Sequence, residues 1–206
     1  MGIVVNDSQN LFMLQTRSNS YAFGIDNQGL VRHLYWGSRI NAMEDFEMPE
    51  LAEVSTNDPV YEITKEEFPV YGGLRYKEHC LKVTFADGTR DVAYEYVNYE
   101  IQKNEQCEEL VIILKDKHYA LVMELHYKIY EAYDLMERFV VLKNESTEVM
   151  QIEKLHSGQF HVPYEGLNFR NVHGHWGAEQ QKFVQKVDYG KSFRNRRGIP
   201  ATITIH

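Results

Sequence analysis

The chain has 206 residues and 43% hydrophobic side chains, enough to bury a full core as one large domain. Its 30 acidic and 22 basic side chains give a formal net charge of −8, and an acidic protein repels phosphate backbones, which argues against a nucleic-acid partner. No stretch approaches the ~20 apolar residues of a membrane helix, and the N-terminus lacks a signal-peptide pattern. We therefore expect a cytoplasmic protein with no membrane partner.

The first part of the chain reads as β-strands. Residues 11–16 begin as an apolar strand, and residues 20–25 alternate, with Tyr21, Phe23 and Ile25 on one face. A turn at 26–29 leads into a strand at 30–37, which predicts a hairpin. Trp36, near the end of that strand, is interpreted as a core tryptophan.

Two irregular segments follow. Residues 41–66 are acidic, contain Pro49 and Pro59 and show no clean period, which predicts a long surface loop of the kind that is usually functional or disordered. In residues 66–78, Pro69 and the paired glycines force the backbone out of regular geometry. The plainer interpretation is a loop corner between strands; its aromatic side chains could also cover a core or offer a flat surface to a sugar.

The rest of the chain continues the strand pattern. An Asp-Gly turn at 86–89 predicts a hairpin between strands at 79–85 and 91–101. Further strands are expected at 109–114, 119–130, 134–144, 150–160, 183–187 and 201–206. Short strands at close intervals predict an all-β sandwich or barrel of antiparallel sheets. The last strand stops in mid-pattern with an uncovered edge, so we expect a chain truncated at its C-terminus.

Chemical motifs are sparse. His173 and His175 have the spacing of a possible metal pair on one strand face, but the sequence supplies no third ligand, so no metal is predicted. Cys80 and Cys107 match no metal or redox spacing. The chain has no Gly-x-Ser-x-Gly element, phosphate loop or dinucleotide fingerprint. From the residues alone we predict no cofactor and no catalytic residue.

Five motifs, in order over nearly the whole chain, resemble the N-terminal domain of the α-galactosidases of glycoside hydrolase family 36. They are Leu-Tyr-Trp-Gly at 34–37, Glu-Phe-Pro-Val-Tyr-Gly-Gly-Leu-Arg at 67–75, Tyr-Asp-Leu-Met-Glu-Arg at 133–138, His-Gly-His-Trp-Gly-Ala-Glu at 173–179, and Arg-Arg-Gly-Ile at 196–199 with a terminal His206. The chain departs from the family pattern at Ala178, where Arg is usual, at Ile205, where Ser is usual, and at Gly73-Leu74. The departures indicate a divergent branch and leave the substrate preference open.

The resemblance implies a galactose-mutarotase-like β-supersandwich over residues 1–206. It also implies that the chain is the N-terminal domain of a retaining α-galactosidase that hydrolyses terminal α-galactosides such as melibiose and raffinose. The family's catalytic aspartates lie in a barrel of about 250 residues, which this chain cannot also hold, so the chain alone is expected to be inactive. Its implied partners are its own catalytic barrel and the neighbouring subunits of a homo-oligomer.

The resemblance also implies one substrate-binding residue. In tetrameric family members an acidic loop of this domain reaches the sugar pocket of a neighbouring subunit, and its counterpart here is the segment around 48–53. Ala52 stands where some members have a sugar-contacting Asp. Glu53 is the nearest carboxylate, and a carboxylate that accepts from two hydroxyls suits galactose.

Two other functions remain open. The first is a mutarotase-like enzyme, with His161, His173 or His175 and Glu165 or Glu179 as acid and base. The second is a galactose-binding module without catalysis, in which Tyr71, Tyr76 or Trp176 forms the stacking platform.

Overall fold

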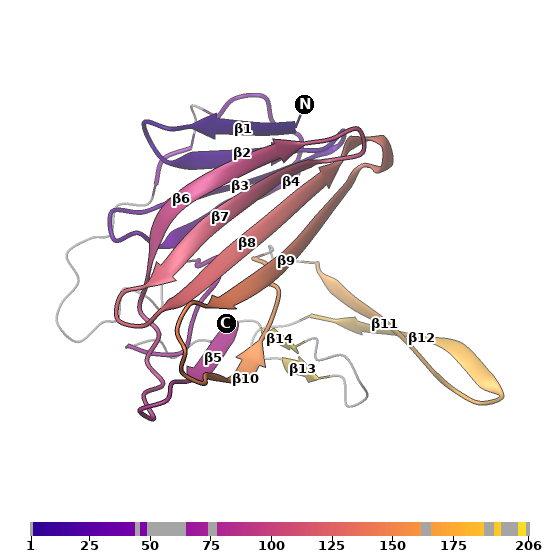
Figure 1. Cartoon of the computed structure of the whole chain (residues 1–206). Helices are drawn as coiled ribbons and strands as arrows, with labels where there is room; N and C mark the ends of the chain where they lie inside the picture. The colour runs from indigo at the N-terminus through magenta and orange to yellow at the C-terminus, as the bar shows by residue number, and fades with distance from the viewer. Residues whose placement is uncertain are drawn as a thin grey trace, which may run out of the picture. The chain divides into compact units, whose positions relative to one another are not determined.

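A computed structural model describes residues 2–43, 46–48, 65–73, 78–161, 166–187, 192–194 and 202–204 (Figure 1). The predicted site residue Glu53, and with it Tyr76 and Glu165, lies outside the described residues. The chain divides into two compact units, Met1–His161 and Val162–His206, which we describe separately.

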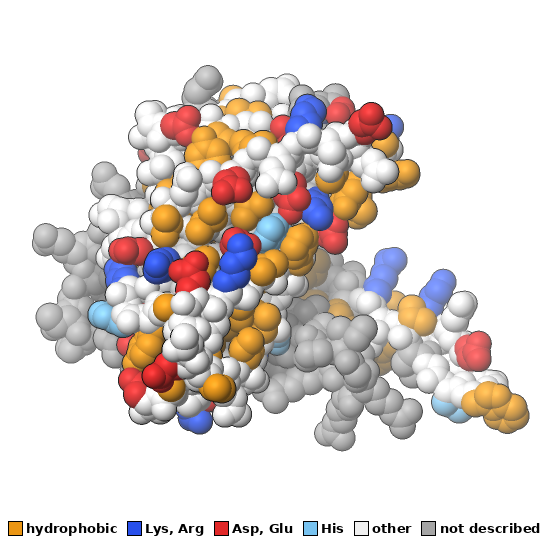
Figure 2. Space-filling view, viewed as in Figure 1, with side chains coloured by type: hydrophobic (Ala, Val, Ile, Leu, Met, Phe, Trp, Pro, Cys, Tyr) orange, Lys and Arg blue, Asp and Glu red, His pale blue; other side chains and the backbone are white. Residues whose placement is uncertain are grey.

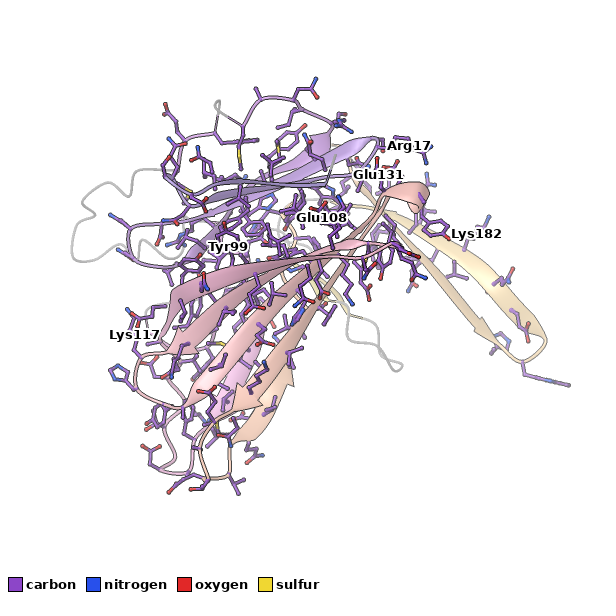
Figure 3. The ribbon with its side chains drawn as sticks, turned by 45° about the horizontal axis from the view of Figure 1, so that its top comes forward. Arg17, Tyr99, Glu108, Lys117, Glu131 and Lys182 are labelled. Carbon is purple, nitrogen blue, oxygen red and sulfur yellow. The ribbon has the colours of Figure 1, made fainter. Side chains whose placement is uncertain are left out.

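The first unit contains two four-stranded antiparallel sheets, which Figures 1 and 3 show as layers facing one another. Strand order follows chain order in both sheets. One sheet holds β1 (Gly2–Asn6), β2 (Leu11–Gln15), β3 (Asn19–Ile25) and β4 (Val31–Ser38). The other holds β6 (Tyr94–Lys103), β7 (Glu108–Asp116), β8 (Leu121–Tyr130) and β9 (Leu135–Asn144). Together these layers confirm the all-β fold class and its large antiparallel sheets.

Smaller elements complete the described chain. In the first unit β5 (Leu81–Thr84) pairs with β10 (Gln151–Leu155), and a 3-10 turn, η1 (Glu131–Tyr133), joins β8 to β9. The second unit holds two antiparallel pairs: β11 (Asn168–His175) with β12 (Ala178–Lys186), and β13 (Ser192–Arg194) with β14 (Thr202–Thr204). Within the described ranges there is no α-helix, and none of the elements has the length and hydropathy that crossing a membrane as a helix requires.

Alternating side chains place the main core between the two sheets of the first unit. Along β8 the inward side chains of Met123, Leu125, Tyr127 and Ile129 are buried, as expected for a strand with one dry face and one wet face. They pack against inward side chains of β2, β3 and β7, which are Phe12, Leu14, Tyr21, Phe23, Leu110, Ile112 and Leu114. Figure 2 shows acidic and basic side chains interspersed over the outer face of β6–β9.

A second, smaller cluster covers the outer face of β2 and β3. Leu11, Met13 and Ala22 are buried there together with Met43, and Phe46 and Met48 pack against them. The described beginning of the acidic segment, which the sequence indicated as a surface loop, is therefore anchored by its apolar residues. This cover explains why every residue of β2 is buried.

The predicted hairpin between 79–85 and 91–101 is wrong in its pairing. The turn itself forms, since the Phe85 N–H donates to the Thr89 carbonyl at 2.9 Å. However, β5 pairs with β10, and β6 pairs with β7. The chain beyond the turn is held elsewhere, because the Val92 N–H donates to the Tyr71 carbonyl at 3.1 Å and the Ala93 N–H donates to the Asp116 carboxylate at 2.9 Å. A turn signal fixes a local reversal of direction, while these longer-range bonds choose the partner strand.

Candidate functional site

The segment around Pro69, expected to be a loop corner, runs through the core. Glu66, Glu67, Phe68 and Val70 are each 0% exposed. Backbone bonds hold this segment beside β4: the Glu67 N–H donates to the Val31 carbonyl at 2.9 Å. A carboxylate is thereby placed inside the sandwich, where a charge is stable only if it is paired and hydrogen-bonded.

Four side chains from both sheets surround the Glu67 carboxylate. The Tyr21 hydroxyl on β3 donates to Oε1 at 2.6 Å, and His33 Nδ1 on β4 lies 2.8 Å from the same oxygen. The Tyr127 hydroxyl on β8 donates to Oε2 at 3.1 Å, and Arg138 Nη1 on β9 lies 2.7 Å from it. Glu67 therefore joins the two layers of the sandwich.

The guanidinium of Arg138 is nearly as buried as its partner, but it also lines the cavity described below. Its Nη2 donates to the Glu67 backbone carbonyl at 2.7 Å. Its Cζ lies 5.1 Å from the ring centroid of Tyr127 and 5.5 Å from that of Phe160, which are cation–π distances. A Cβ on Gly158 would lie 2.3 Å from Arg138 Cζ, so only glycine allows the backbone this close. The Arg138 side chain is 4% exposed.

The pairing sets the charge states of this cluster. Burial alone would raise the pKa of Glu67, but the Arg138 charge and the contacts from His33 and Tyr21 outweigh it and hold that pKa below its ordinary value. Burial, and then the charge of Glu67, raise the pKa of both Tyr21 and Tyr127 well above the usual range. The carboxylate therefore stays ionised and both phenols stay protonated at neutral pH.

Glu66 has its own buried arginine. Arg32 Nη1 lies 3.6 Å from Glu66 Oε1, and Arg32 Nε donates to Asp26 at 2.6 Å, with the Arg32 side chain only 1% exposed. His161 Nε2 lies 2.9 Å from the Glu66 carbonyl oxygen, and the His161 ring packs against that of His33 at a centroid distance of 5.3 Å. Two consecutive glutamates are thus each matched to an arginine, which is the arrangement of a structural polar core.

A β-bulge at Leu34 decides where Trp36 points. In the β3–β4 ladder, Phe23 faces His33 and Tyr21 faces Trp36, so the register shifts by one residue between the two pairs. Cross-strand partners share a face of the sheet, and the bulge therefore puts Trp36 on the same face as His33. The prediction of a core tryptophan is wrong, because the ring lies at the end of the sandwich and is 45% exposed.

A cavity of about 290 Å³ opens over the Glu67 cluster. We call it the Trp36 pocket; its lining residues are Thr16, Asn19, Tyr21, Trp36, Tyr127, Asp134, Leu135, Met136, Arg138 and Phe160. At its mouth the β2–β3 turn meets η1, and Figure 3 shows Arg17 and Glu131 at this end of the sandwich. The Ser18 N–H and hydroxyl donate to Asp134 at 2.9 and 2.5 Å, so both sheets build one rim.

Among the residues that the sequence nominated for chemistry and that the structure describes in the first unit, only His161 lies beside the Glu67 cluster. The register of the β11–β12 pair shifts between His173 and His175. Among the described residues, no group of three His, Cys, Asp or Glu side chains is placed to hold a metal ion. Tyr71 is 39% exposed and lies outside the Trp36 pocket, and Trp176, at the turn of the β11–β12 hairpin, is 96% exposed.

Sequence reasoning missed the Glu67–Arg138 cluster, although a signal was present. Trp36, Glu67 and Arg138 belong to three separate motifs of the resemblance, at 34–37, 67–75 and 133–138. The structure brings these three motifs together around one buried carboxylate and one pocket. The three motifs of the family resemblance thus indicated residues that lie at one site in the structure.

The facing sheets, with polar groups bridging them at one end, define a β-supersandwich domain. The chain belongs to the glycosyl hydrolase family 36 N-terminal domain family, whose family model matches residues 29–203.

Individual relatives agree with this assignment. The chain is 25% identical over 194 residues to a probable α-galactosidase G of Aspergillus terreus, a match that covers 87% of this chain and 26% of the relative. An α-galactosidase from Lactobacillus brevis has a similar structure, with a TM-score of 0.80 at 23% identity over 95% of this chain and 30% of that one. A variant of AgaA from Geobacillus stearothermophilus, solved in complex with raffinose, has a TM-score of 0.76 at 21% identity over 91% of this chain and 29% of that one. The chain therefore spans between a quarter and a third of the length of these relatives.

Proposed function

We propose that residues 1–206 are the non-catalytic N-terminal domain of a longer retaining α-galactosidase. The observation that carries this proposal is the family match over 29–203, combined with the small share of each relative that the chain covers. The longer enzyme hydrolyses terminal α-galactosides such as melibiose and raffinose in the cytoplasm; the raffinose complex of AgaA supports this substrate class. Its catalytic barrel and neighbouring subunits of a homo-oligomer are the partners of this domain.

In that role the domain supplies a scaffold, oligomer contacts and, through Glu53 of the acidic segment, part of the sugar pocket. The Glu67 cluster supports the scaffold role. Glu67 is 0% exposed, and its oxygens are occupied by Tyr21, Tyr127, His33 and Arg138. Such a carboxylate stabilises the fold and is closed to substrate.

The test is an activity comparison with a chromogenic α-galactoside. We expect turnover by the longer enzyme and none by the 206-residue chain, because the family's catalytic aspartates belong to the barrel. Robust cleavage by the purified chain, abolished by a substitution within it, would contradict both the domain assignment and the non-catalytic role.

The mutarotase alternative is weaker on the geometry. His33 and Glu67 form a histidine–carboxylate pair of the kind that acid–base enzymes use. Their side chains are only 3% and 0% exposed, so a sugar would have to displace core residues to reach them. We expect the chain not to accelerate the change in optical rotation of freshly dissolved α-galactose, and a clear acceleration would revive this alternative.

A further inference from the structure

The Trp36 pocket has an aromatic wall that faces solvent. Trp36 and Phe160 are 45% and 51% exposed, and their ring centroids lie 5.6 Å apart. Arg138 and the buried rings of Tyr21 and Tyr127 lie at its floor. Exposed neighbouring rings at the mouth of a cavity offer a surface for an apolar face of a ligand, such as the C–H face of a pyranose ring.

Polar groups are distributed around that wall. The Nε–H of Arg138 is buried and has no hydrogen-bond partner among the described residues, so it is a donor with spare capacity beside the pocket. At the rim, each oxygen of the Asp134 carboxylate accepts one hydrogen bond from Ser18. This carboxylate is a pure acceptor that lines the pocket. Hydrogen bonds from Ser18 and then from Thr16 lower the pKa of Asp134 to about 2, so this acceptor is ionised at neutral pH.

Charge and size select the class of ligand. The positive charge of Arg138 is already balanced by Glu67, and the ionised Asp134 at the rim disfavours an anion. A cavity of about 290 Å³ is near the lower limit, roughly 300 Å³, of small-molecule sites. We propose that the Trp36 pocket binds one neutral pyranose unit, with its C–H face on Trp36 and Phe160 and its hydroxyls on Asp134 and Arg138.

The choice of the first sugar to test rests on the proposed function, because the longer enzyme would release galactose. The geometric argument for the Trp36 pocket does not depend on that function. Methyl α-D-galactopyranoside is titrated into the 206-residue chain and followed by calorimetry. In a parallel titration, Trp176→Phe leaves Trp36 as the sole tryptophan, and its emission should shift as the sugar binds. We expect saturable binding with a Kd of about 1–10 mM. D-galacturonate, in which a carboxylate replaces the C6 hydroxymethyl group of galactose, should bind at least about fivefold more weakly.

Variants locate the site. Trp36→Ala should weaken binding by about tenfold or more, and Asp134→Asn by about three- to tenfold. Trp176→Phe, in the exposed hairpin turn of the other unit, is the matched control and should leave the affinity unchanged. Trp36→Phe retains an aromatic surface and should keep an intermediate affinity, which separates loss of stacking from loss of fold. A thermal melt of each variant monitors folding.

Several results would overturn the proposal. One is the absence of saturable binding up to about 100 mM. Another is an unchanged affinity in both folded Trp36→Ala and Asp134→Asn. A third result concerns the longer enzyme with its catalytic site blocked by 1-deoxygalactonojirimycin. If no sugar binding remains in that enzyme, the Trp36 pocket does not bind sugar there, because another polypeptide segment fills it. A longer enzyme without α-galactosidase activity would instead contradict the proposed function and leave the titration result standing.

Discussion

Arg138 binds both the side chain and the backbone of Glu67. Its Nη1 lies 2.7 Å from the carboxylate Oε2, and its Nη2 donates to the backbone carbonyl of the same residue at 2.7 Å. The two residues are 71 positions apart in the chain. One side chain of β9 thereby fixes both the position and the charge of a segment that runs between the sheets.

Breaking this pair should be costly. Glu67→Gln leaves the Arg138 charge uncompensated in the core, and removal of one partner of a buried ion pair costs about 3–5 kcal/mol. Urea unfolding followed by circular dichroism measures this loss. Lys115→Ala is the control: Lys115 and Glu145 lie 3.6 Å apart, with side chains 50% and 53% exposed. That surface pair should contribute no more than about 1 kcal/mol.

A double substitution separates pairing from packing. In Glu67→Gln with Arg138→Met the buried charge is gone altogether, so the combined loss should be clearly smaller than the sum of the two single losses. Strictly additive losses would show that the two side chains do not stabilise one another.

Asp134, at the rim of the Trp36 pocket, should make the stability of the folded chain depend on pH. Asp134 has a pKa of about 2 in the folded protein against an ordinary value of 3.8. Its folded pKa is depressed, so its contribution to stability is fully present above about pH 4 and is lost as the pH falls toward 2. Asp134→Asn should therefore lose stability at neutral pH and show a shallower decline between pH 4 and 2. Parallel stability curves for the two proteins over that range would contradict this account.

The two cysteines should differ in reactivity. Both are free; Cys80 is buried and Cys107 is partly exposed. Burial raises the pKa of the Cys80 thiol to about 12, and the thiolate is the reactive form. A chromogenic disulfide reagent at pH 8 should titrate one thiol rapidly in the native chain and both in denaturant. Cys107→Ser should abolish the fast phase, and rapid reaction of that variant would mean that Cys80 is accessible.

Glu53 has a sharp test in the longer enzyme. If it accepts hydrogen bonds from a sugar in a neighbouring subunit, Glu53→Ala should cost on the order of 1.5–3 kcal/mol of substrate binding, seen as a higher KM for melibiose. Glu47→Ala removes an exposed carboxylate of the same acidic segment and is the matched control. Deleting 47–55 should weaken binding or assembly while the sandwich still folds. Unchanged KM and oligomer mass in all three would leave the segment as a surface connection.

The alternation of apolar and polar residues predicted the strands well. It did not predict the buried Glu67 cluster or the orientation of Trp36. Tyr21, Phe23 and Ile25 do share the core face, and the expected strands at 119–130 and 134–144 correspond to β8 and β9. The alternating pattern could not show the bulge at Leu34, because a bulge leaves no mark in the sequence. The bulge nevertheless moves the Trp36 side chain to the opposite face of β4 from the one that strict alternation would give it. Nor could the alternating pattern show the burial of Glu67, since a charge is buried only where a distant arginine is brought to it.

The shared use of Arg138 has an evolutionary consequence. Its guanidinium contacts the Glu67 carboxylate, the Glu67 carbonyl and the rings of Tyr127 and Phe160. A substitution at position 138 therefore removes the partner of several groups at once. Lysine, with a compact ammonium in place of a planar fork, cannot make the two-point contact. Across related sequences we expect positions 67 and 138 to covary, with glycine at 158 wherever arginine is kept.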